Sequence, residues 1–443
     1  MTSEGAAPVR TDPDVVVVGG GVAGLFCAYH LRRAGASVTV LERGALGGPQ
    51  SCSSGNTGFV GTHGAAPLAE PGLRAFRALG MLSADAPFYV KPRADRESLR
   101  WLGHFARACT ATAAAAGFRT LIELKRRSLD LLLELCEIPS IAATFESPGI
   151  VLAFKTAEGF AEASRAVSRT VANGVPLRVL RPGELDELEP KTRFDIYGAL
   201  YNPEGAYLRV PEFVVAFGRV LREMGVEIRE HTEVTGFEIS ARGVERLHIE
   251  HGALPTERGA LRTEHGTMRP GDVVLAAGAW STECARLVGI DLTLQPIKGY
   301  SVTVDMPPGG PSRPVLLSEG RMAMVPLGDR LRLGGRLELT GMSTAISARR
   351  VRGMLCTAGE YLPDLAGLPT REAWSGLRPC TPDGVPLIGR ASPRNVLVAV
   401  GYGHIGMGLA PAGGELISRI LAGERPAIDP LPLRPGRFTS TIS

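Results

Sequence analysis

The sequence predicts an α/β protein in which a Rossmann-like dinucleotide-binding domain is interrupted by an α+β domain with a mixed antiparallel sheet. The first observation is an apolar strand at 14–18, followed by the glycine-rich segment 19–24, a helical stretch and a second strand that leads to Glu42. The second observation is that two later apolar strands, at 272–278 and 396–400, also run into small or glycine-rich residues. Because helix-rich and strand-rich stretches separate these parts, we expect one domain to be inserted into the other.

The composition is that of a globular protein. The 443 residues allow about two or three domains, and the net charge of +4 is too small to indicate a nucleic-acid partner. Seven cysteines without a C-x-x-C pair predict neither a disulfide framework nor a metal site, and fit a reducing compartment. No run of about 18 apolar residues occurs. We therefore expect a cytoplasmic protein with a disordered lead over 1–13.

The segment 19–24 has the spacing of a dinucleotide-binding loop. Gly19 permits a tight turn, Gly21 lets the backbone approach a pyrophosphate, and Gly24 lets helix and strand pack closely. The helix that begins near Val22 directs its first amides at the phosphates. Glu42 follows after about 20 residues, where a carboxylate accepts hydrogen bonds from ribose hydroxyls. A glycine turn that binds nothing is the alternative, and the flanking strands and helix argue against it.

The remaining elements follow from hydrophobic period and from the positions of glycine and proline. The glycine-, serine- and asparagine-rich segment 47–64 is predicted to be a long irregular loop that wraps the cofactor. Apolar residues of the first helix recur at the helical period, so His30 is expected in the core rather than at a ligand. Helices are expected at 95–138, 157–173, 212–224 and 411–422. Strands are expected at 225–229, within 234–276, and at 299–305, 322–326, 331–335, 371–377 and 396–400.

Two further points favour a long dinucleotide that is contacted from several directions. Ala277 and Gly278 end a buried strand, where small residues let a ligand approach the backbone. Gly401–Gly408 precedes a helix, whose start carries a partial positive charge and would stabilise a reduced flavin. A nicotinamide has no need of this arrangement, so the pattern favours FAD. A plain strand-to-helix turn is the alternative for the last segment.

Arg378 follows the strand at 371–377 and lies close in sequence to the last glycine-rich loop. An arginine in this place can bind a carboxylate through two parallel hydrogen bonds. A structural or surface ion pair is the alternative. The chain has no G-x-S-x-G, H-E-x-x-H or Walker pattern, which removes the common serine hydrolase, zinc protease and P-loop classes.

Taken together, these residues resemble the D-amino acid oxidase-type (DAO) family of FAD-dependent enzymes, most closely its bacterial D-amino acid dehydrogenase branch. The resemblance runs from Asp14 to about Asp429, and its most specific segments are 53–58, 87–93, 296–301 and 374–389. It implies a FAD-binding domain over 14–85, 191–295 and 366–443. A substrate-binding domain would then comprise 86–190 and 296–365.

The resemblance also implies which residues bind FAD. Glu42 and Arg43 would flank the adenosine, and the backbone of Val234 would meet the adenine. The other implied FAD-binding residues are Gly19, Gly21, Val22, Ala23, Gly24, Cys52, Ser53, Asn56, Thr57, Gly58, Ala277, Gly278, Trp280, Gly401, Tyr402, Gly403, His404, Ile405, Gly406, Met407 and Gly408. We expect non-covalent FAD, because Cys380 lies near but not at the position where distant relatives attach the flavin.

The implied reaction is oxidative deamination of an amino acid. Arg378 would hold the carboxylate and turn the Cα hydrogen toward flavin N5. The neutral amine would lose a hydride, and the imine would hydrolyse to a 2-oxo acid and ammonia. Much of the catalysis would come from orientation and from the electrostatics of the helix start at the flavin. His404, Tyr300 and Lys298 are further catalytic candidates, and a structural role is the alternative for His404 and Lys298.

Two departures from the family concern the substrate side chain. The glycine oxidase branch has an arginine where this chain has His404, and a tyrosine where it has Met322. Met322 and Met324 favour a less polar pocket, although core packing explains methionines equally well. The amino acid and its stereochemistry therefore stay open.

The electron acceptor also stays open, between a quinone, a redox partner and oxygen. A glycine, sarcosine or imino-acid oxidase is one alternative, and a FAD-binding subunit of a multi-subunit dehydrogenase is another. Peripheral contact with the inner face of a membrane and a homo-oligomer are compatible with the sequence.

Overall fold

The computed structural model describes residues 12–62, 64, 67–69, 71, 88–93, 95–255 and 261–438. Residues 1–11 of the expected lead lie outside this set, as does Pro87 of the segment 87–93.

A six-stranded sheet has the order β10-β2-β1-β14-β21-β20. Its strands are β1 (Val15–Val18), β2 (Val38–Leu41), β10 (Glu227–Arg229), β14 (Asp272–Leu275), β20 (Leu387–Arg390) and β21 (Val396–Val400). All neighbours pair in parallel except β20 and β21. Both faces of a parallel sheet are covered, which explains why β1 consists of four buried valines.

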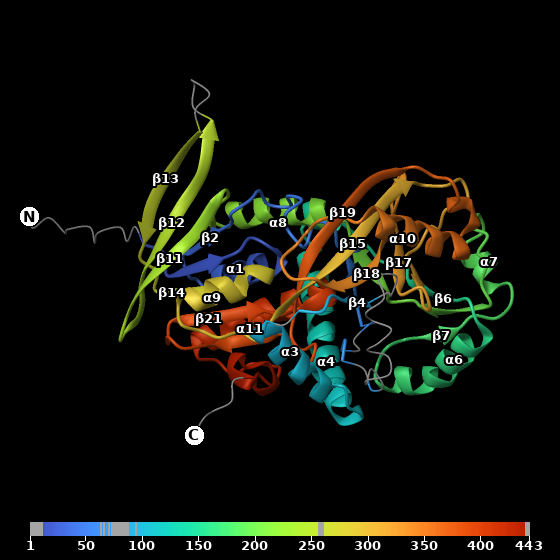
Figure 1. Ribbon diagram of the computed structural model, residues 1–443, viewed down its shortest axis with the longest axis horizontal. Coiled ribbons are helices and arrows are strands. Elements are labelled where there is room, and N and C mark those ends of the chain that lie inside the picture. The colour runs from blue at the N-terminus through green and yellow to red at the C-terminus, as the bar shows by residue number, and fades with distance from the viewer. Residues whose placement is uncertain are drawn as a thin grey trace, which may run out of the picture.

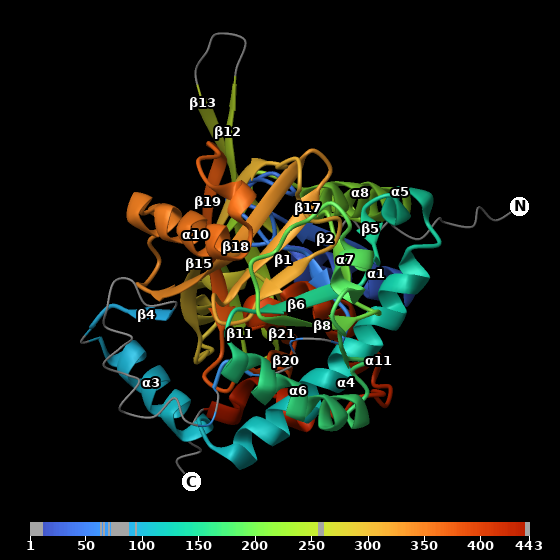
Figure 2. The same cartoon turned by 90° about the vertical axis from the view of Figure 1, so that its right-hand side faces the viewer.

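Helices cover one face of this sheet and a small sheet covers the other (Figure 1). α1 (Val22–Arg33), α8 (Val210–Glu223) and α11 (Ala410–Ala422) share a core with Val15 and Val17. On the opposite face, Val16 and Val18 pack with β11 (Thr232–Ser240), β12 (Gly243–Pro255), β13 (Leu261–Met268) and α9 (Ser281–Leu287). The β12–β13 hairpin extends away from the rest of the molecule (Figure 2). His30 of α1 is buried as expected, and burial lowers its pKa to about 4.

The second large sheet has the order β19-β15-β18-β17-β16-β6-β8-β7, and β4 also pairs with β18. Its strands are β4 (Phe88–Val90), β6 (Ile150–Phe154), β7 (Arg178–Val179), β8 (Gly198–Asn202), β15 (Gln295–Asp305), β16 (Val315–Leu317), β17 (Met322–Leu327), β18 (Arg330–Leu339) and β19 (Thr370–Cys380). Most pairs are antiparallel, while β16–β6 and β18–β4 are parallel, so the sheet is mixed as predicted. α10 (Ala348–Tyr361) shares a core with one face of it.

The remaining elements lie around these two sheets. They are α3 (Arg96–Ala108), α4 (Ala111–Leu135), α5 (Pro139–Ala142), α6 (Ala157–Ala172), α7 (Glu184–Leu188), and a small sheet of β3 (Phe59–Val60), β9 (Ala206–Leu208) and β5 (Phe145–Glu146). Short 3₁₀ helices occur at Gly278–Trp280, Pro363–Leu365, Gly403–Gly408, Leu431–Leu433 and Pro435–Phe438.

The helix predicted over 95–138 is wrong as a single element. Thr110 adopts an extended backbone, and its hydroxyl accepts a hydrogen bond from the Ala113 amide, so α4 begins there with its own N-cap. The strands β4, β6, β8 and β9 and the helix α10 were not predicted. β8 and β19 lie within ranges assigned from sequence to the FAD-binding domain, but they pair with β6 and β15 in the second large sheet. The domain ranges themselves stay a prediction.

Candidate active site

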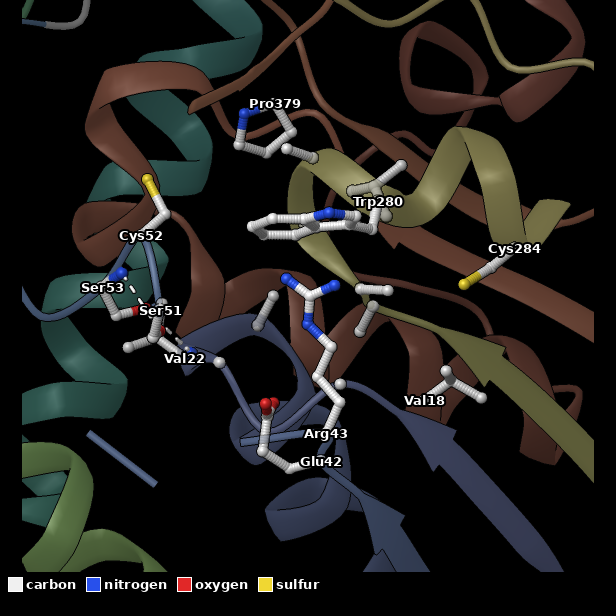
Figure 3. A pocket seen from close by; sticks show the side chains of 18 of the residues that line it. Val18, Val22, Glu42, Arg43, Ser51, Cys52, Ser53, Trp280, Cys284 and Pro379 are labelled. Atoms are coloured by element: carbon white, nitrogen blue, oxygen red, sulfur yellow. Dashed lines mark hydrogen bonds between the residues drawn. The ribbon is translucent and has the colours of Figure 1, made fainter. Parts of the chain in front are cut away.

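A cavity of about 440 Å³ opens at the carboxyl ends of β1, β2, β14 and β21. In open α/β sheets this edge is where ligands bind. Figure 3 shows Cys52 and Pro379 at one end of the cavity and Val18 and Cys284 at the other. The site is therefore assembled from segments that are far apart in the sequence.

The glycine-rich turn at the start of α1 forms the floor of the cavity. Gly19 has a φ of +112°, and a Cβ on it would lie 2.5 Å from the Ala276 carbonyl oxygen. A Cβ on Gly24 would lie 1.9 Å from the Gly19 carbonyl oxygen. Both positions consequently require glycine, for the turn and for the packing of the helix on the strand.

Glu42 fixes this turn from the end of β2. Its Oε2 accepts a hydrogen bond of 2.7 Å from the Gly20 amide, and its Oε1 accepts one of 2.9 Å from the Gly44 amide. An ionised carboxylate has about four acceptor positions, so capacity remains for ribose hydroxyls. Glu42 thus supports the loop in addition to the ligand contact expected from the sequence.

Arg43 and Trp280 form the wall beside Glu42. Arg43 Cζ lies 3.8 Å from the centroid of the Trp280 ring, a cation–π contact. The indole and the guanidinium lie one above the other inside the cavity (Figure 3). These two planar groups lie next to Val234 in the cavity lining, and flat side chains of this kind suit the packing of a planar base.

The loop at 50–56 closes the cavity from the side of the second large sheet. Ser53 Oγ accepts a hydrogen bond of 3.5 Å from the Val22 amide, which joins the loop to the N-terminus of α1. Cys52 also lines the cavity, and burial raises the pKa of its thiol against the opposing charge of Arg378. Burial likewise raises the pKa of Cys380 to about 12. Both cysteines are therefore poor nucleophiles.

Arg378 lies on β19 opposite Ile297 of β15. Its guanidinium packs on the backbone of Gly299, where a Cβ would lie 1.4 Å from Arg378 Nη1. Nη1 is buried and has no hydrogen-bond partner among the described residues. Arg378 is not among the residues that line the cavity, although its neighbour Pro379 is. A buried cationic donor is costly unless it is paired, so this atom is suited to an anionic ligand.

His404 lies in the glycine-rich turn before α11, beside Gly403 in a small recess. The residue is exposed to solvent, and protein is packed densely around it at longer range. Desolvation by this surrounding protein, and then the charges of Arg378 and Lys125, lower its pKa to about 4. Lys125 was not predicted: it is buried on α4, donates to the Gly61 carbonyl at 3.0 Å, and has its pKa lowered to about 7 by burial. His404 is thus a neutral imidazole at pH 7.

Lys298 and Tyr300 are not brought together with Arg378. They alternate with Ile297 and Gly299 along β15, so they face the opposite side of the sheet. There Lys298 Nζ lies 2.8 Å from Glu338 Oε2, and the Tyr300 hydroxyl donates to the same oxygen at 3.1 Å. The pleat of β15 places Lys298 under α10, on the sheet face opposite Arg378, which favours the structural alternative for this residue.

Met322 and Met324 of β17 lie on the same face of the sheet as Tyr300, because Met322 and Tyr300 both pair with Gly335 of β18. Met322 and Met324 are buried in the core that β17 shares with Tyr300 and α10. Their packing explains them, and the sequence-based inference of a less polar substrate pocket loses its support.

Most of the residues predicted from sequence to bind the cofactor line the cavity. They are Gly19, Gly21, Val22, Ala23, Glu42, Arg43, Cys52, Ser53, Asn56, Val234, Ala277, Gly278, Trp280, Tyr402, Gly403, Gly406 and Met407. The others, Gly24, Thr57, Gly58, Gly401, His404, Ile405 and Gly408, are not among its lining residues. The sequence reasoning missed Gln50, Ser51, Thr232, Glu233, Thr235, Glu283, Cys284, Leu287 and Pro379. Their proximity to the predicted segments was the only signal.

Comparison with known proteins identifies the family. A profile described as FAD dependent oxidoreductase (DAO) matches residues 14–420. The chain belongs to this family. A D-amino acid dehydrogenase of Rhizorhabdus wittichii is 30% identical over 422 residues, covering 94% of this chain and 97% of that protein. A second D-amino acid dehydrogenase, from Granulibacter bethesdensis, is 28% identical over 429 residues, covering 96% of this chain and 99% of that protein.

The fold is shared with solved flavoenzymes. The crystal structure of glycine oxidase from Geobacillus kaustophilus matches with a TM-score of 0.70 and 24% identity, over 96% of this chain and 98% of that one. The predicted family and the predicted combination of a Rossmann-like domain with a mixed-sheet domain are thus confirmed.

The cavity suits the FAD on which this family depends. It extends from a carboxylate and two planar side chains at one end, past the amide-rich start of α1, to the turn at 403–407 at the other. These are the groups that ribose, adenine, pyrophosphate and flavin require, in that order. Within the described residues, no cluster of three or more His, Cys, Asp or Glu side chains could hold a metal ion. Nor does any helix in those residues have the length and apolarity to cross a membrane.

Proposed function

We propose that this flavoenzyme dehydrogenates D-amino acids to imines, which hydrolyse to 2-oxo acids and ammonia. The observation that carries the proposal is Arg378 Nη1, a buried cationic donor that has no partner among the described residues and lies near the cavity wall formed by Cys52 and Pro379. An α-carboxylate supplies the missing acceptor. The relatives named D-amino acid dehydrogenase support the substrate class.

The binding residues of this chain would orient the substrate and hold FAD without a covalent bond. Arg378 binds the carboxylate and fixes the direction of the Cα–H bond, so that part of the binding energy is used to hold the substrate in the reactive orientation. Because His404 is neutral at pH 7, it adds no positive charge that would repel an ammonium or compete for the carboxylate. FAD, when bound, supplies the two-electron acceptor for the reaction. The raised pKa values of Cys52 and Cys380 support non-covalent binding.

The electrons would then pass to a quinone or another acceptor rather than primarily to oxygen, as the dehydrogenase names of the relatives favour. A glycine, sarcosine or imino-acid oxidase is the main alternative. A larger assembly, a homo-oligomer and contact with a membrane surface stay predictions.

One anaerobic experiment tests the proposal. The purified protein should show a flavin absorption spectrum, and panels of D-amino acids, L-amino acids, glycine, sarcosine and proline are added without oxygen. Bleaching of the flavin by D-amino acids is the expected result. Bleaching by none of them would contradict the proposed reaction, and bleaching by glycine or sarcosine alone would favour the oxidase alternative. Oxygen or a quinone analogue, added afterwards, then identifies the acceptor by the rate at which the colour returns.

A further inference from the structure

The loop that lines the cavity at 50–56 rests on the face of the second large sheet that carries Arg378. Along β19, Trp374, Gly376 and Arg378 lie on one face, and the pairing through β15 places Gly334 and Arg332 of β18 on it as well. Thr57 packs on Gly334, where a Cβ would lie 2.3 Å from the threonine methyl. The sheet face that would bind the substrate is therefore also the support of the cofactor loop.

Arg332 makes the polar part of this contact. Its Nη1 donates to the Ser54 carbonyl at 3.1 Å and to the Asn56 carbonyl at 3.5 Å. The side chain is 11% exposed, and burial lowers its pKa against the opposing charges of Glu372 and Glu212. Glu372 lies 3.7 Å from Nη2 and is half exposed, so it compensates the buried charge only partly. The two loop carbonyls are the close acceptors of this guanidinium.

Trp374 makes the van der Waals contact between the sheet and the loop. Its Nε1 donates to the Pro49 carbonyl at 2.7 Å, and a Cβ on Gly55 would lie 1.9 Å from its ring. The ring thus covers the loop backbone directly, and the loop has a glycine at the point of closest approach. The start of the loop is bonded to Trp374 and its end to Arg332.

We propose that Arg332 and Trp374 are positioning residues that fix the loop at 49–57 on the sheet and thereby set the affinity for FAD. Neither residue lines the cavity, but both hold the backbone that presents Cys52, Ser53 and Asn56 to it. A loop free of these contacts has to be ordered when FAD binds, and that ordering entropy weakens binding. The proposal depends on FAD binding in the cavity, and not on which amino acid is oxidised.

The test measures FAD affinity of the apoprotein, by quenching of flavin fluorescence, for Arg332→Met and Trp374→Phe. Arg330→Met is the matched control. Arg330 lies on the same strand and the same sheet face, its side chain is 57% exposed, and its ion pair with the exposed Asp329 is long at 4.0 Å and therefore weak. We expect the FAD dissociation constant to rise by about tenfold or more in each test variant and to stay unchanged in the control. Amide hydrogen exchange over 49–57 should accelerate in the apo forms of both test variants.

Two outcomes would overturn the proposal: an unchanged FAD dissociation constant in both test variants, or weaker FAD binding without faster exchange in the loop. At saturating FAD the turnover of Arg332→Met should recover, because Arg332 touches no reacting group; turnover that stays low at saturating FAD would also contradict a positioning role. If Arg332→Met does not fold, Trp374→Phe tests the proposal by itself, because phenylalanine keeps an aromatic ring on the loop and removes only the hydrogen bond to Pro49. A negative result in the amino acid assay would not change these FAD-binding results, so the proposed reaction and the proposed role of Arg332 and Trp374 are tested independently.

Discussion

Replacing Arg378 by alanine should remove carboxylate binding without a loss of folding stability. The guanidinium Nη1 is buried and unpartnered within the described residues, so its removal leaves no protein acceptor without a donor. A desolvated charge pair with a substrate carboxylate is worth about 2–5 kcal/mol. The corresponding loss of kcat/KM is ~30-fold to ~5,000-fold. The Tm of the variant should not fall, because an unpaired buried charge is itself unfavourable.

The assay is steady-state reduction of an artificial acceptor with a D-amino acid that the anaerobic screen has identified. Arg371→Ala is the matched control, since Arg371 is on the same strand, is exposed, and pairs with Asp305 at the surface. Arg378→Lys should recover only part of the loss, because an ammonium cannot form the two parallel bonds of a guanidinium.

A second substrate separates binding of the carboxylate from general damage to the site. The second substrate is the amine that has the same side chain as the amino acid but no carboxylate. The wild type and Arg378→Ala should oxidise it equally slowly. Equal losses with amino acid and amine would show that Arg378 acts through structure, and an unchanged kcat/KM for the amino acid would remove it from the site.

Three further predictions concern titratable side chains that are wholly or partly buried. Glu42→Gln should raise the FAD dissociation constant by about tenfold, the effect of weakening charge-assisted hydrogen bonds, measured by fluorescence titration of the apoprotein; unchanged binding would contradict a role for this carboxylate. Glu338→Gln removes the carboxylate that pairs with the buried side chains of Lys298 and Arg350, and it should lower the free energy of unfolding by about 3–5 kcal/mol in urea titrations; a small effect would show that water reaches the cluster. His30 has a folded pKa of about 4 against 6.5 in the unfolded chain, so the unfolded state binds the proton first and stability should decline as the pH falls from about 6.5 toward 4, by up to about 3 kcal/mol. His30→Leu should flatten that decline in Tm, and an identical pH profile would refute the assignment.

The first strand–helix–strand unit was predictable because its determinants are local. The valines of β1, the glycines at 19 and 24, and the acid at 42 lie within one stretch of sequence, and each has a steric or hydrogen-bonding reason that does not depend on the rest of the chain. The same holds for the helix at 210–223 and the last strand at 396–400. By contrast, β6 and β8 were missed because their partners are far away in sequence, and the break at Thr110 was missed because one cap interrupted an otherwise continuous apolar pattern.

By itself the sequence determined the fold class and, through the resemblance of its motifs, the FAD-dependent family, because these depend on residue type and short-range spacing. It also singled out Arg378 as the candidate for binding a carboxylate, which stays a prediction. Only the tertiary structure decided which side chains share a face. The pleat and pairing of β15 put Arg378 beside the cofactor loop and turn Lys298 and Tyr300 into a buried cluster with Glu338. Pairing across strands is set by long-range contacts, and a shift of one residue would reverse every side chain. The sequence therefore identified Arg378, Lys298 and Tyr300 as candidates, and the sheet pairing placed Arg378 on one face and the other two on the opposite face.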